Sequence, residues 1–313
     1  MKELEYIELK GVLPFNRFFF RSCYFHQLLA CYKYFGVSPE IVIGNYLNLY
    51  IQKEGELRTK EIQVFDKENF EALTGIRQIK FLPQEPIQKE LIARLRKGAP
   101  SIIVVDCFYI PFRADTFGKI HTDHYITVYG YDSVKRVFII LEHESEKDFR
   151  YVRHEFSFEN LEKAFQAGVR CLQQGRDPFV TFEKRHNPDE RYFEKLRLRM
   201  KELSEEINTS YKTLKKYFRK ANIFDNFSSA YKIMYNNLYW QKLRQMYQMT
   251  FVYGHNEGKI KKYFSDVMKG YKILSSDSSD KKKDLGDILR IYLQIRIICK
   301  REQQIKTLML YNN

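Results

Sequence analysis

Residues 17–36 read Arg-Phe-Phe-Phe-Arg-Ser-Cys-Tyr-Phe-His-Gln-Leu-Leu-Ala-Cys-Tyr-Lys-Tyr-Phe-Gly, and we interpret the rest of the chain from this stretch. Apolar side chains recur from Phe25 at helical spacing, Ser22 is a suitable N-cap, and Gly36 ends the pattern. Cys23 therefore falls in the first turn of a predicted helix. Unpaired backbone N–H groups and the helix dipole stabilise a thiolate there, and the same N–H groups can bind an oxyanion.

A thiol at this position fits two interpretations. Papain-like enzymes place their nucleophile on a cysteine that opens a buried helix, whereas most free cysteines are only small buried hydrophobic residues. A thiol nucleophile also needs a nearby base, and the base needs a group that orients it. Cys23 is therefore a candidate nucleophile whose partners must be found elsewhere in the sequence.

The composition is that of a folded protein with a sizeable core. The chain has 313 residues, of which 44% are hydrophobic and 29% charged, which suits about two domains. Its five cysteines form no CxxC pair, so we expect a reducing compartment and no structural zinc. The N-terminus lacks the apolar segment of a signal peptide, and no apolar run reaches the ~20 residues that span a bilayer. We expect a cytoplasmic protein.

The net charge of +14 is concentrated in the C-terminal part of the chain. Residues 1–182 carry 25 Lys and Arg against 24 Asp and Glu, a difference of +1, whereas residues 183–313 carry 28 against 15, a difference of +13. A basic surface attracts acidic partners such as nucleic acid, anionic membranes or acidic proteins. It also keeps a helical domain soluble, so the charge alone does not choose a partner.

Residues 1–183 are predicted to form an α+β domain. After the helix opened by Cys23, a proline starts a helix predicted over 39–49, and Gly98 ends another over 87–97. Continuous β-branched or alternating runs then predict an antiparallel sheet. Its strands are expected at 3–9, 101–110, 124–131, 136–142 and 177–183, with a further strand within 52–66 and helices at 67–73 and 158–165.

Residues 184–313 are predicted to form a basic all-α domain. No proline occurs beyond Pro188, and helical periodicity dominates the remaining sequence. The breaks between the periodic segments contain Asn, Ser, Gly and Asp. They divide the domain into helices expected over 189–220, 226–250, 258–274 and 285–310.

The best candidate for a base is His124, which begins a predicted strand after a polar loop. The partner strand ends at Glu142. The paired residue numbers in this hairpin are expected to sum to about 266–267, which places Glu142 opposite His124 or its neighbour. A carboxylate beside an imidazole fixes its tautomer and stabilises its cation. The sequence therefore predicts a triad of Cys23, His124 and Glu142.

Three other histidines compete for the role of the base. His26 lies one turn after Cys23 on the same helix, where a base would sit behind the thiol, so we rank it lower. His121 and His143 are the alternatives to His124.

Two polar residues flank Cys107, which is expected in the core because it lies in an apolar run. Asp106 and Tyr109 belong to a strand that should lie beside the strand of His124. They either line a substrate cleft or pair with the loop that follows.

Three segments together resemble a known family. They are the helix opened by Cys23, the stretch Val105-Asp-Cys-Phe-Tyr-Ile-Pro-Phe112 and the stretch His121-Thr-Asp-His-Tyr-Ile-Thr-Val-Tyr-Gly-Tyr-Asp132. Their order and spacing are similar to those of the N-terminal domain family of the butirosin-biosynthesis acyltransferase (BtrH-type), over residues 11–180. The peptidase domains of bacteriocin exporters, which share the order Cys, His, Asp, are more distant relatives.

This resemblance implies a papain-like fold with a catalytic triad. It also implies acyl transfer from the phosphopantetheine thioester of an acyl or peptidyl carrier protein to an amine, in antibiotic or nonribosomal-peptide metabolism. Cys23 would be the nucleophile, His124 the base and Glu142 the orienting acid. No metal or organic cofactor of its own is implied, and neither a membrane nor nucleic acid is an expected partner.

Two positions depart from the family pattern. Glu142 stands where such enzymes usually carry Asp, and Arg17 stands where papain-like enzymes carry a Gln that binds the oxyanion. Asn16, beside it, could donate the missing hydrogen bond, and Arg17 would stabilise negative charge more strongly.

The sequence therefore favours a cysteine acyltransferase or thioester hydrolase. A cysteine peptidase that processes a peptide intermediate would use the same triad and is the first alternative. The second is a non-enzymatic binding protein on the same fold, in which basic, aromatic-rich helices hold a partner. The sequence does not identify the acyl donor or the acceptor.

Overall fold

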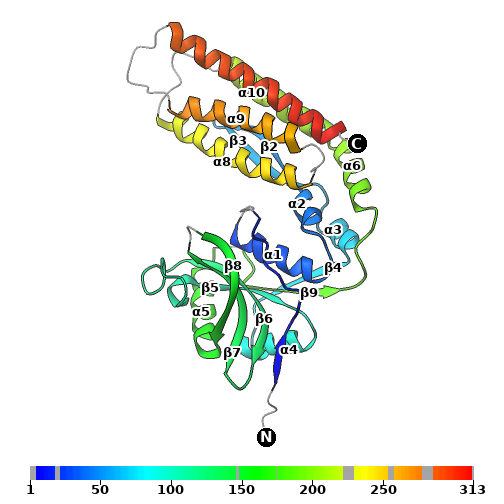
Figure 1. Ribbon diagram of the computed structural model, residues 1–313, viewed down its shortest axis with the longest axis vertical. Helices are drawn as coiled ribbons and strands as arrows, with labels where there is room; N and C mark the ends of the chain where they lie inside the picture. Colours follow the sequence, from blue (N-terminus) through cyan, green and yellow to red (C-terminus); the bar gives the residue numbers. More distant parts are fainter. Residues whose placement is uncertain are drawn as a thin grey trace. The chain divides into compact units, whose positions relative to one another are not determined.

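The computed structural model describes residues 5–17, 22–145, 148–173, 175–220, 229–252, 257–276 and 285–311 (Figure 1). The fold is mixed α+β, with an antiparallel sheet and helices in the N-terminal part and a run of helices, α6 to α10, in the C-terminal part. Two compact units are each discontinuous in sequence. We call Met1–Val42 with Lys67–Asp189 the sheet unit, and Ile43–Asp66 with Glu190–Asn313 the helical unit.

The sheet unit is built on seven antiparallel strands in the order β4-β9-β5-β6-β7-β8, with β1 paired to one end of β6. Buried β-branched residues form β5, which is inaccessible to solvent along its whole length. Such a strand needs cover on both faces. The strands are β1 (Tyr6–Glu8), β4 (Ile76–Phe81), β5 (Ser101–Asp106), β6 (Asp123–Asp132), β7 (Val137–Ser145), β8 (Asp148–Ser157) and β9 (Phe179–Lys184).

Two helices cover opposite faces of β7. Ala30 of α1 packs in one apolar cluster with Ile139, whereas the ring of Phe158 of α5 lies 4.5 Å from the ring of Phe138. Because neighbouring residues of a strand point to opposite faces, α1 and α5 lie on different sides of the sheet. The helices of this unit are α1 (Cys23–Tyr34), α3 (Lys67–Thr74), α4 (Ile87–Arg96), the single 3₁₀ turn η1 (Cys107–Tyr109) and α5 (Phe158–Cys171).

The helical unit contains a β-hairpin as well as helices. Glu54 and Gly55 both have positive φ, which forms the tight turn between β2 (Tyr46–Lys53) and β3 (Glu56–Gln63). Tyr50 and Leu57 of this hairpin belong to the same core cluster as the buried apolar residues of α7 to α10. The helices are α6 (Tyr192–Glu202), α7 (Ser204–Lys220), α8 (Ser229–Val252), α9 (Glu257–Ser276) and α10 (Leu285–Tyr311); α2 (Pro39–Gly44) lies where the chain passes between the units.

The structure corrects several predicted elements. The helix predicted over 39–49 is wrong beyond Gly44, because Tyr46–Lys53 pair with Glu56–Gln63 instead of continuing the helix. The strand predicted over 101–110 ends at Asp106, and the helix predicted over 189–220 is divided at Leu203. Two strands, β4 and β8, were not predicted at all.

The predicted division at residue 184 stays a prediction. The compact units follow a different path, because Ile43–Asp66 group with the helices that begin after Glu190. The antiparallel sheet with its helices and the C-terminal run of helices are confirmed.

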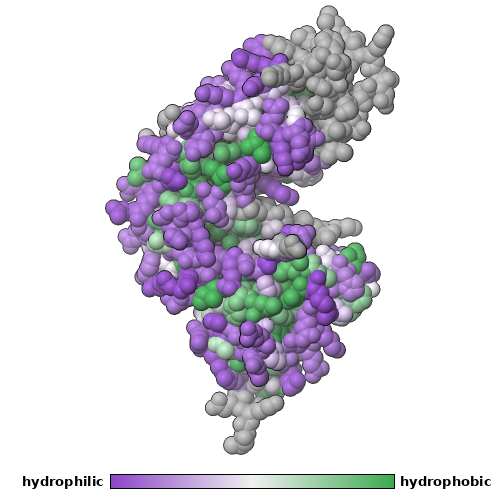
Figure 2. All heavy atoms as spheres, turned by 180° about the vertical axis from the view of Figure 1, so that it is seen from behind, coloured by the Kyte–Doolittle hydropathy of each residue, from purple (hydrophilic) through white to green (hydrophobic). Residues whose placement is uncertain are grey.

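The visible surface in Figure 2 is mostly hydrophilic, with apolar residues gathered in a few patches. None of the described helices combines the length and the apolar composition that crossing a bilayer requires.

Candidate active site

Cys23 is the first residue of α1, as its sequence context predicts. Ser22 precedes it in extended conformation, and the Ser22 side chain does not cap the helix. The N–H groups of Phe25 and His26 bond the Ser22 carbonyl at 3.0 and 3.3 Å, whereas those of Cys23 and Tyr24 have no acceptor within the helix. Cys23 as a residue is partly exposed, whereas its thiol is largely buried. The residue thus combines partial access from solvent with a helix N-terminus.

His124 joins this thiol to a buried carboxylate. Its Nε2 lies 2.7 Å from Oε2 of Glu142, and both side chains are buried. The charge of the same imidazole acts on the Cys23 thiol and lowers its pKa, so the two side chains are neighbours. Since Glu142 occupies Nε2, the ring nitrogen left for the thiol is Nδ1. The three residues that the sequence singled out thus form a continuous chain of contacts.

Charge stabilises a thiolate–imidazolium pair. Burial alone would raise the pKa of the Cys23 thiol, but the charge and hydrogen bond of His124, with the backbone of Tyr125, bring the pKa below its usual value. Burial would likewise lower the pKa of His124, whereas the charges of Glu142 and Cys23 raise it well above 6.5. The two shifts have opposite directions, which is the pattern of an activated cysteine nucleophile.

Gln27, on the next turn of α1, connects this helix to β6 and β7. The pairing of β6 with β7 contains an irregularity between Val128 and Gly130 and extends as far as Thr127–Leu141. There the Nε2 of Gln27 donates to the carbonyl oxygens of Tyr125 and Leu141, at 3.2 and 3.3 Å. One side-chain amide thus bonds the backbone of both strands. Helix α1 is fixed to the strands that carry His124 and Glu142.

Glu142 is held from its other oxygen as well. Oε1 accepts the backbone N–H of His143 at 2.8 Å and lies 3.5 Å from Nη1 of Arg113, whose side chain is almost fully buried. Arg113 is fixed by two bonds of 2.9 Å to Asp115. Burial would raise the pKa of Glu142, but His124, then His143 and Arg113, lower it below its usual value. The carboxylate stays charged and oriented.

A metal ion is the competing interpretation of this cluster. Ligand atoms of His124, Glu142 and His143 lie within 4.8 Å of one another, a spacing that suits a cation. Nη1 of Arg113, however, lies 3.1 Å from Nε2 of His143 and 3.5 Å from Glu142. Because a buried guanidinium repels a second cation, these residues fit an ion-paired histidine better than a metal.

His26 and His121 do not share this position. His26 is buried with its Nδ1 3.1 Å from the carbonyl oxygen of Phe15, and burial lowers its pKa to about 4. It is therefore neutral near pH 7. His121 is exposed and pairs with Asp106 instead, at 2.6 Å.

Asp106 is the last residue of β5, and Tyr109 is the last residue of the 3₁₀ turn η1 that follows. The carboxylate of Asp106 accepts the N–H groups of Phe108 and Thr122 at 3.0 and 3.1 Å and pairs with His121, so it organises this loop. Tyr109 packs edge-on against the ring of Phe108. Among these contacts, none reaches Cys23, and a role of either residue in binding substrate stays a prediction.

The two residues proposed to bind the oxyanion lie at the edge of the sheet. Asn16 pairs with the backbone of Tyr151 on β8, donating from Nδ2 and accepting at Oδ1, each at 2.9 Å. Its amide is thus engaged in fixing β8. Arg17 is exposed. Their part in stabilising an oxyanion stays untested.

Sequence reasoning did not find Gln27, Arg113 or Tyr151. Gln27 lies beside His26 on the predicted helix, where a buried amide gives no periodic signal. Arg113 directly follows the stretch Val105–Phe112, which carries part of the family resemblance. Tyr151 lies on β8, which alternates apolar with charged residues and was not identified as a strand.

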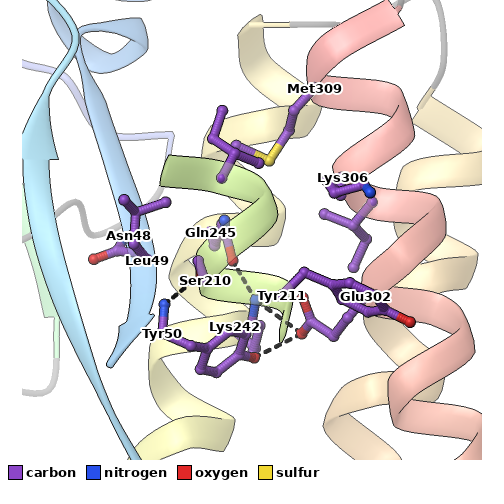
Figure 3. Close-up of a pocket in the computed structure, with 12 residues that line it drawn as sticks. Asn48, Leu49, Tyr50, Ser210, Tyr211, Lys242, Gln245, Glu302, Lys306 and Met309 are labelled. Carbon is purple, nitrogen blue, oxygen red and sulfur yellow. Dashed lines mark hydrogen bonds and ion pairs between the residues drawn. The ribbon is translucent and has the colours of Figure 1, made fainter. Parts of the chain in front are cut away.

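A second buried charged cluster lies in the helical unit (Figure 3). Nζ of Lys242 on α8 lies 2.8 Å from Glu302 of α10 and donates to Gln245 at 2.6 Å. The Tyr50 hydroxyl donates to Glu302 at 2.7 Å and lies 3.0 Å from that of Tyr271. Each of these polar groups therefore has its partner inside the cluster.

Comparison with known proteins supports the resemblance for part of the chain. Residues 57–143 match the family model of the N-terminal domain of butirosin biosynthesis protein H, which confirms the predicted family over these residues. The match includes His124 and Glu142 but begins after Cys23, so the place of the thiol rests on the geometry above. A comparison with curated proteins found no match to the chain. The matched family supports a biosynthetic enzyme.

Proposed function

We propose, from the match to butirosin biosynthesis protein H and from the contacts of His124, that the chain is a cysteine acyltransferase of papain-like fold. The observation that carries the proposal is one imidazole that is bonded to a buried carboxylate and also interacts electrostatically with the thiol of Cys23, a partly exposed residue at a helix N-terminus. The family name supports a role in biosynthesis, and the acyl chemistry follows from the three side chains.

The first half of the reaction makes an acyl-enzyme. The Cys23 thiolate attacks the carbonyl carbon of a thioester, and the carbonyl electrons move to oxygen to form a tetrahedral oxyanion. When the oxyanion collapses, the carbon–sulfur bond of the donor breaks and the leaving thiolate takes the proton from His124. Glu142 stabilises the imidazolium before this transfer and keeps the ring oriented.

The second half releases the acyl group. An amine attacks the thioester of Cys23, His124 removes the proton from the amine nitrogen, and collapse of the oxyanion returns the thiolate beside an imidazolium. Water in place of the amine gives the hydrolase. The donor in this proposal is the phosphopantetheine thioester of a carrier protein, in the cytoplasm.

The test is acylation of the protein by a simple thioester. An acyl-N-acetylcysteamine should add one acyl mass to the wild-type chain and none to Cys23→Ala, as read by intact-protein mass spectrometry. Cys171→Ser is the matched control, because Cys171 is exposed and its pKa is raised by burial and by Asp106. Equal labelling of wild type and Cys23→Ala, by this donor and by a thioester on a carrier protein, would contradict the proposal.

A further inference from the structure

The hydroxyl of Tyr151 is buried and has no hydrogen-bond partner among the described residues. The residue is 2% exposed. Leaving a buried hydroxyl unpaired is destabilising, so such groups are rare and call for an explanation. A ligand that supplies the missing acceptor is one explanation, provided that the hydroxyl lies where a ligand binds.

The ring of Tyr151 lies in the same layer of rings as the candidate triad. It is stacked on the ring of His26 at 5.1 Å and meets the ring of His143 edge-on at 5.2 Å. The ring of His143 in turn lies 5.3 Å from that of His124. Since His26 is one turn after Cys23 on α1, Tyr151 is bounded on both sides by neighbours of the triad.

The backbone of Tyr151 is fixed independently of its side chain. It lies opposite His143 in the pairing of β7 with β8. On the outer edge of β8, Asn16 forms the two hydrogen bonds already described. A hydroxyl on so restrained a residue can be preorganised for a ligand, which is the property that electrostatic catalysis requires.

The charges around Tyr151 keep its hydroxyl a proton donor. Burial raises the pKa of Tyr151, and the negative charges of Glu142 and of the Cys23 thiolate raise it further, against a smaller opposing effect of Arg113. The phenol is therefore neutral at any working pH. It has a proton to donate, and it lies close enough to Cys23 and Glu142 to sense their charge.

We propose that the Tyr151 hydroxyl is a catalytic residue that donates a hydrogen bond to the oxyanion formed when Cys23 attacks a carbonyl carbon. The proposal rests on the function proposed above. The proton remains on Tyr151, and the backbone N–H of Cys23 is the second donor. The substrate class that this site takes is a carbonyl compound whose oxygen becomes anionic, that is, a thioester or an activated ester.

The test compares two reagents on Tyr151→Phe, both in a Cys171→Ser background. Iodoacetamide alkylates the thiolate by displacing iodide and forms no oxyanion, whereas p-nitrophenyl acetate acylates it through one. We expect the alkylation rate of Cys23 and its pH profile to stay within about twofold of wild type. The rate of p-nitrophenolate release in the first turnover should fall about 10²-fold, as on loss of one oxyanion donor.

Tyr129→Phe is the matched control, because Tyr129 is another buried tyrosine of the sheet unit, packed near Val12 and Ala30. It should change neither rate. An unchanged acylation rate in Tyr151→Phe, or an equal fall of both rates, would overturn the proposal. In the chain that retains both cysteines, acylation of Cys23 by p-nitrophenyl acetate that is no faster than acylation of Cys171 would overturn it too.

This result can be told apart from failure of the proposed function. Because the aryl ester is small and activated, it reads the oxyanion site even if no carrier-bound thioester is a substrate. If thioesters fail to acylate Cys23 but Tyr151→Phe slows p-nitrophenolate release as expected, only the proposed donor is contradicted.

Discussion

Each unit of the protein buries a glutamate that holds a buried cation, yet the two clusters differ in where their contacts end. In the sheet unit, Oε2 of Glu142 lies 2.7 Å from Nε2 of His124. His124 in turn interacts with the thiol of Cys23, which is a partly exposed residue. In the helical unit, Glu302 holds Lys242 at 2.8 Å, and the further contacts of Lys242 are Gln245 and the rings of Tyr50 and Phe264. The first chain of contacts reaches a nucleophile, and the second closes on itself.

The difference teaches that burial and ion pairing do not by themselves mark an active site. Burial lowers the pKa of Lys242, and Glu302 only partly offsets this. The pKa of His124 is instead raised by two neighbours of opposite charge, one of which is a reactive thiol. A group with a perturbed pKa is a candidate for function when one of its partners is itself a reactive side chain.

The largest expected effect is on the acylation rate, which should depend on Glu142 and not on Glu302. Glu142→Gln should lower the rate of Cys23 acylation by up to about 10⁴-fold, the loss known for a serine-enzyme triad whose carboxylate becomes an amide. Glu302→Gln should leave this rate within about twofold. The measurement is single-turnover release of p-nitrophenolate, and comparable losses in both variants would remove the distinction.

The second prediction concerns stability, for which the larger effect is expected in the cluster of the helical unit. Lys242→Met leaves the carboxylate of Glu302 buried without its cation, and it should lower the free energy of unfolding by about 3–5 kcal/mol. The double variant Lys242→Met with Glu302→Leu should recover most of this loss. Urea unfolding followed by circular dichroism gives the comparison.

A control pair for this experiment is Arg301 with Asp266, which lie 2.6 Å apart but are partly exposed. Asp266→Asn should cost less than about 1 kcal/mol, since exposed ion pairs contribute little. A loss as large as that of Lys242→Met would show that burial is not the cause.

Arg113 offers a smaller effect within the sheet unit. Arg113→Met removes the cation beside Glu142, so the pKa of Glu142 should rise and its hold on the imidazolium should weaken. We expect acylation to slow about tenfold, which corresponds to ~1.4 kcal/mol. The acid limb of the pH–rate profile should move to higher pH, whereas Arg113→Lys should restore it. A slower rate with an unshifted profile would indicate a merely structural role.

The smallest effect is a difference in pH dependence between two thiols. The pKa of Cys23 lies below 9.0 because of His124, and that of Cys171 lies above it because of burial and Asp106. A thiolate is present above its pKa, so alkylation of Cys23 by iodoacetamide should reach its plateau at lower pH than alkylation of Cys171. Peptide mass spectrometry after timed labelling separates the two sites. Coincident profiles would contradict the ion pair.

Local sequence patterns sufficed for the elements that carry Cys23, His124 and Glu142. They did not suffice for the register, because the regular pairing at Thr127–Leu141, continued by one residue, puts Glu142 opposite Ile126. The carboxylate still reaches His124, two residues along the strand. The contact between Glu142 and His124 thus forms, although Glu142 does not lie opposite His124 or its neighbour as predicted.

The remaining features depend on contacts that no local pattern encodes. The apolar residues of Tyr46 to Leu49 fit both the helical and the strand period, and only the pairing with Glu56–Gln63 decides for a strand. The charged residues of β8 hid the strand that carries Tyr151. Lys242 and Glu302 lie on different helices, far apart in the chain, so no local sequence pattern predicts their pairing.

The division of the helical unit into two stretches of chain has a consequence for synthesis on the ribosome. A nascent chain that has reached Lys184 contains every strand of the sheet unit and the three residues of the candidate triad. Its hairpin, Tyr46–Gln63, has also been made, but the helices that bury Tyr50 and Leu57 have not. The apolar side chains of the hairpin therefore stay in water until α7 to α10 have also been made. For as long as these helices are missing, the hairpin is open to non-native contacts.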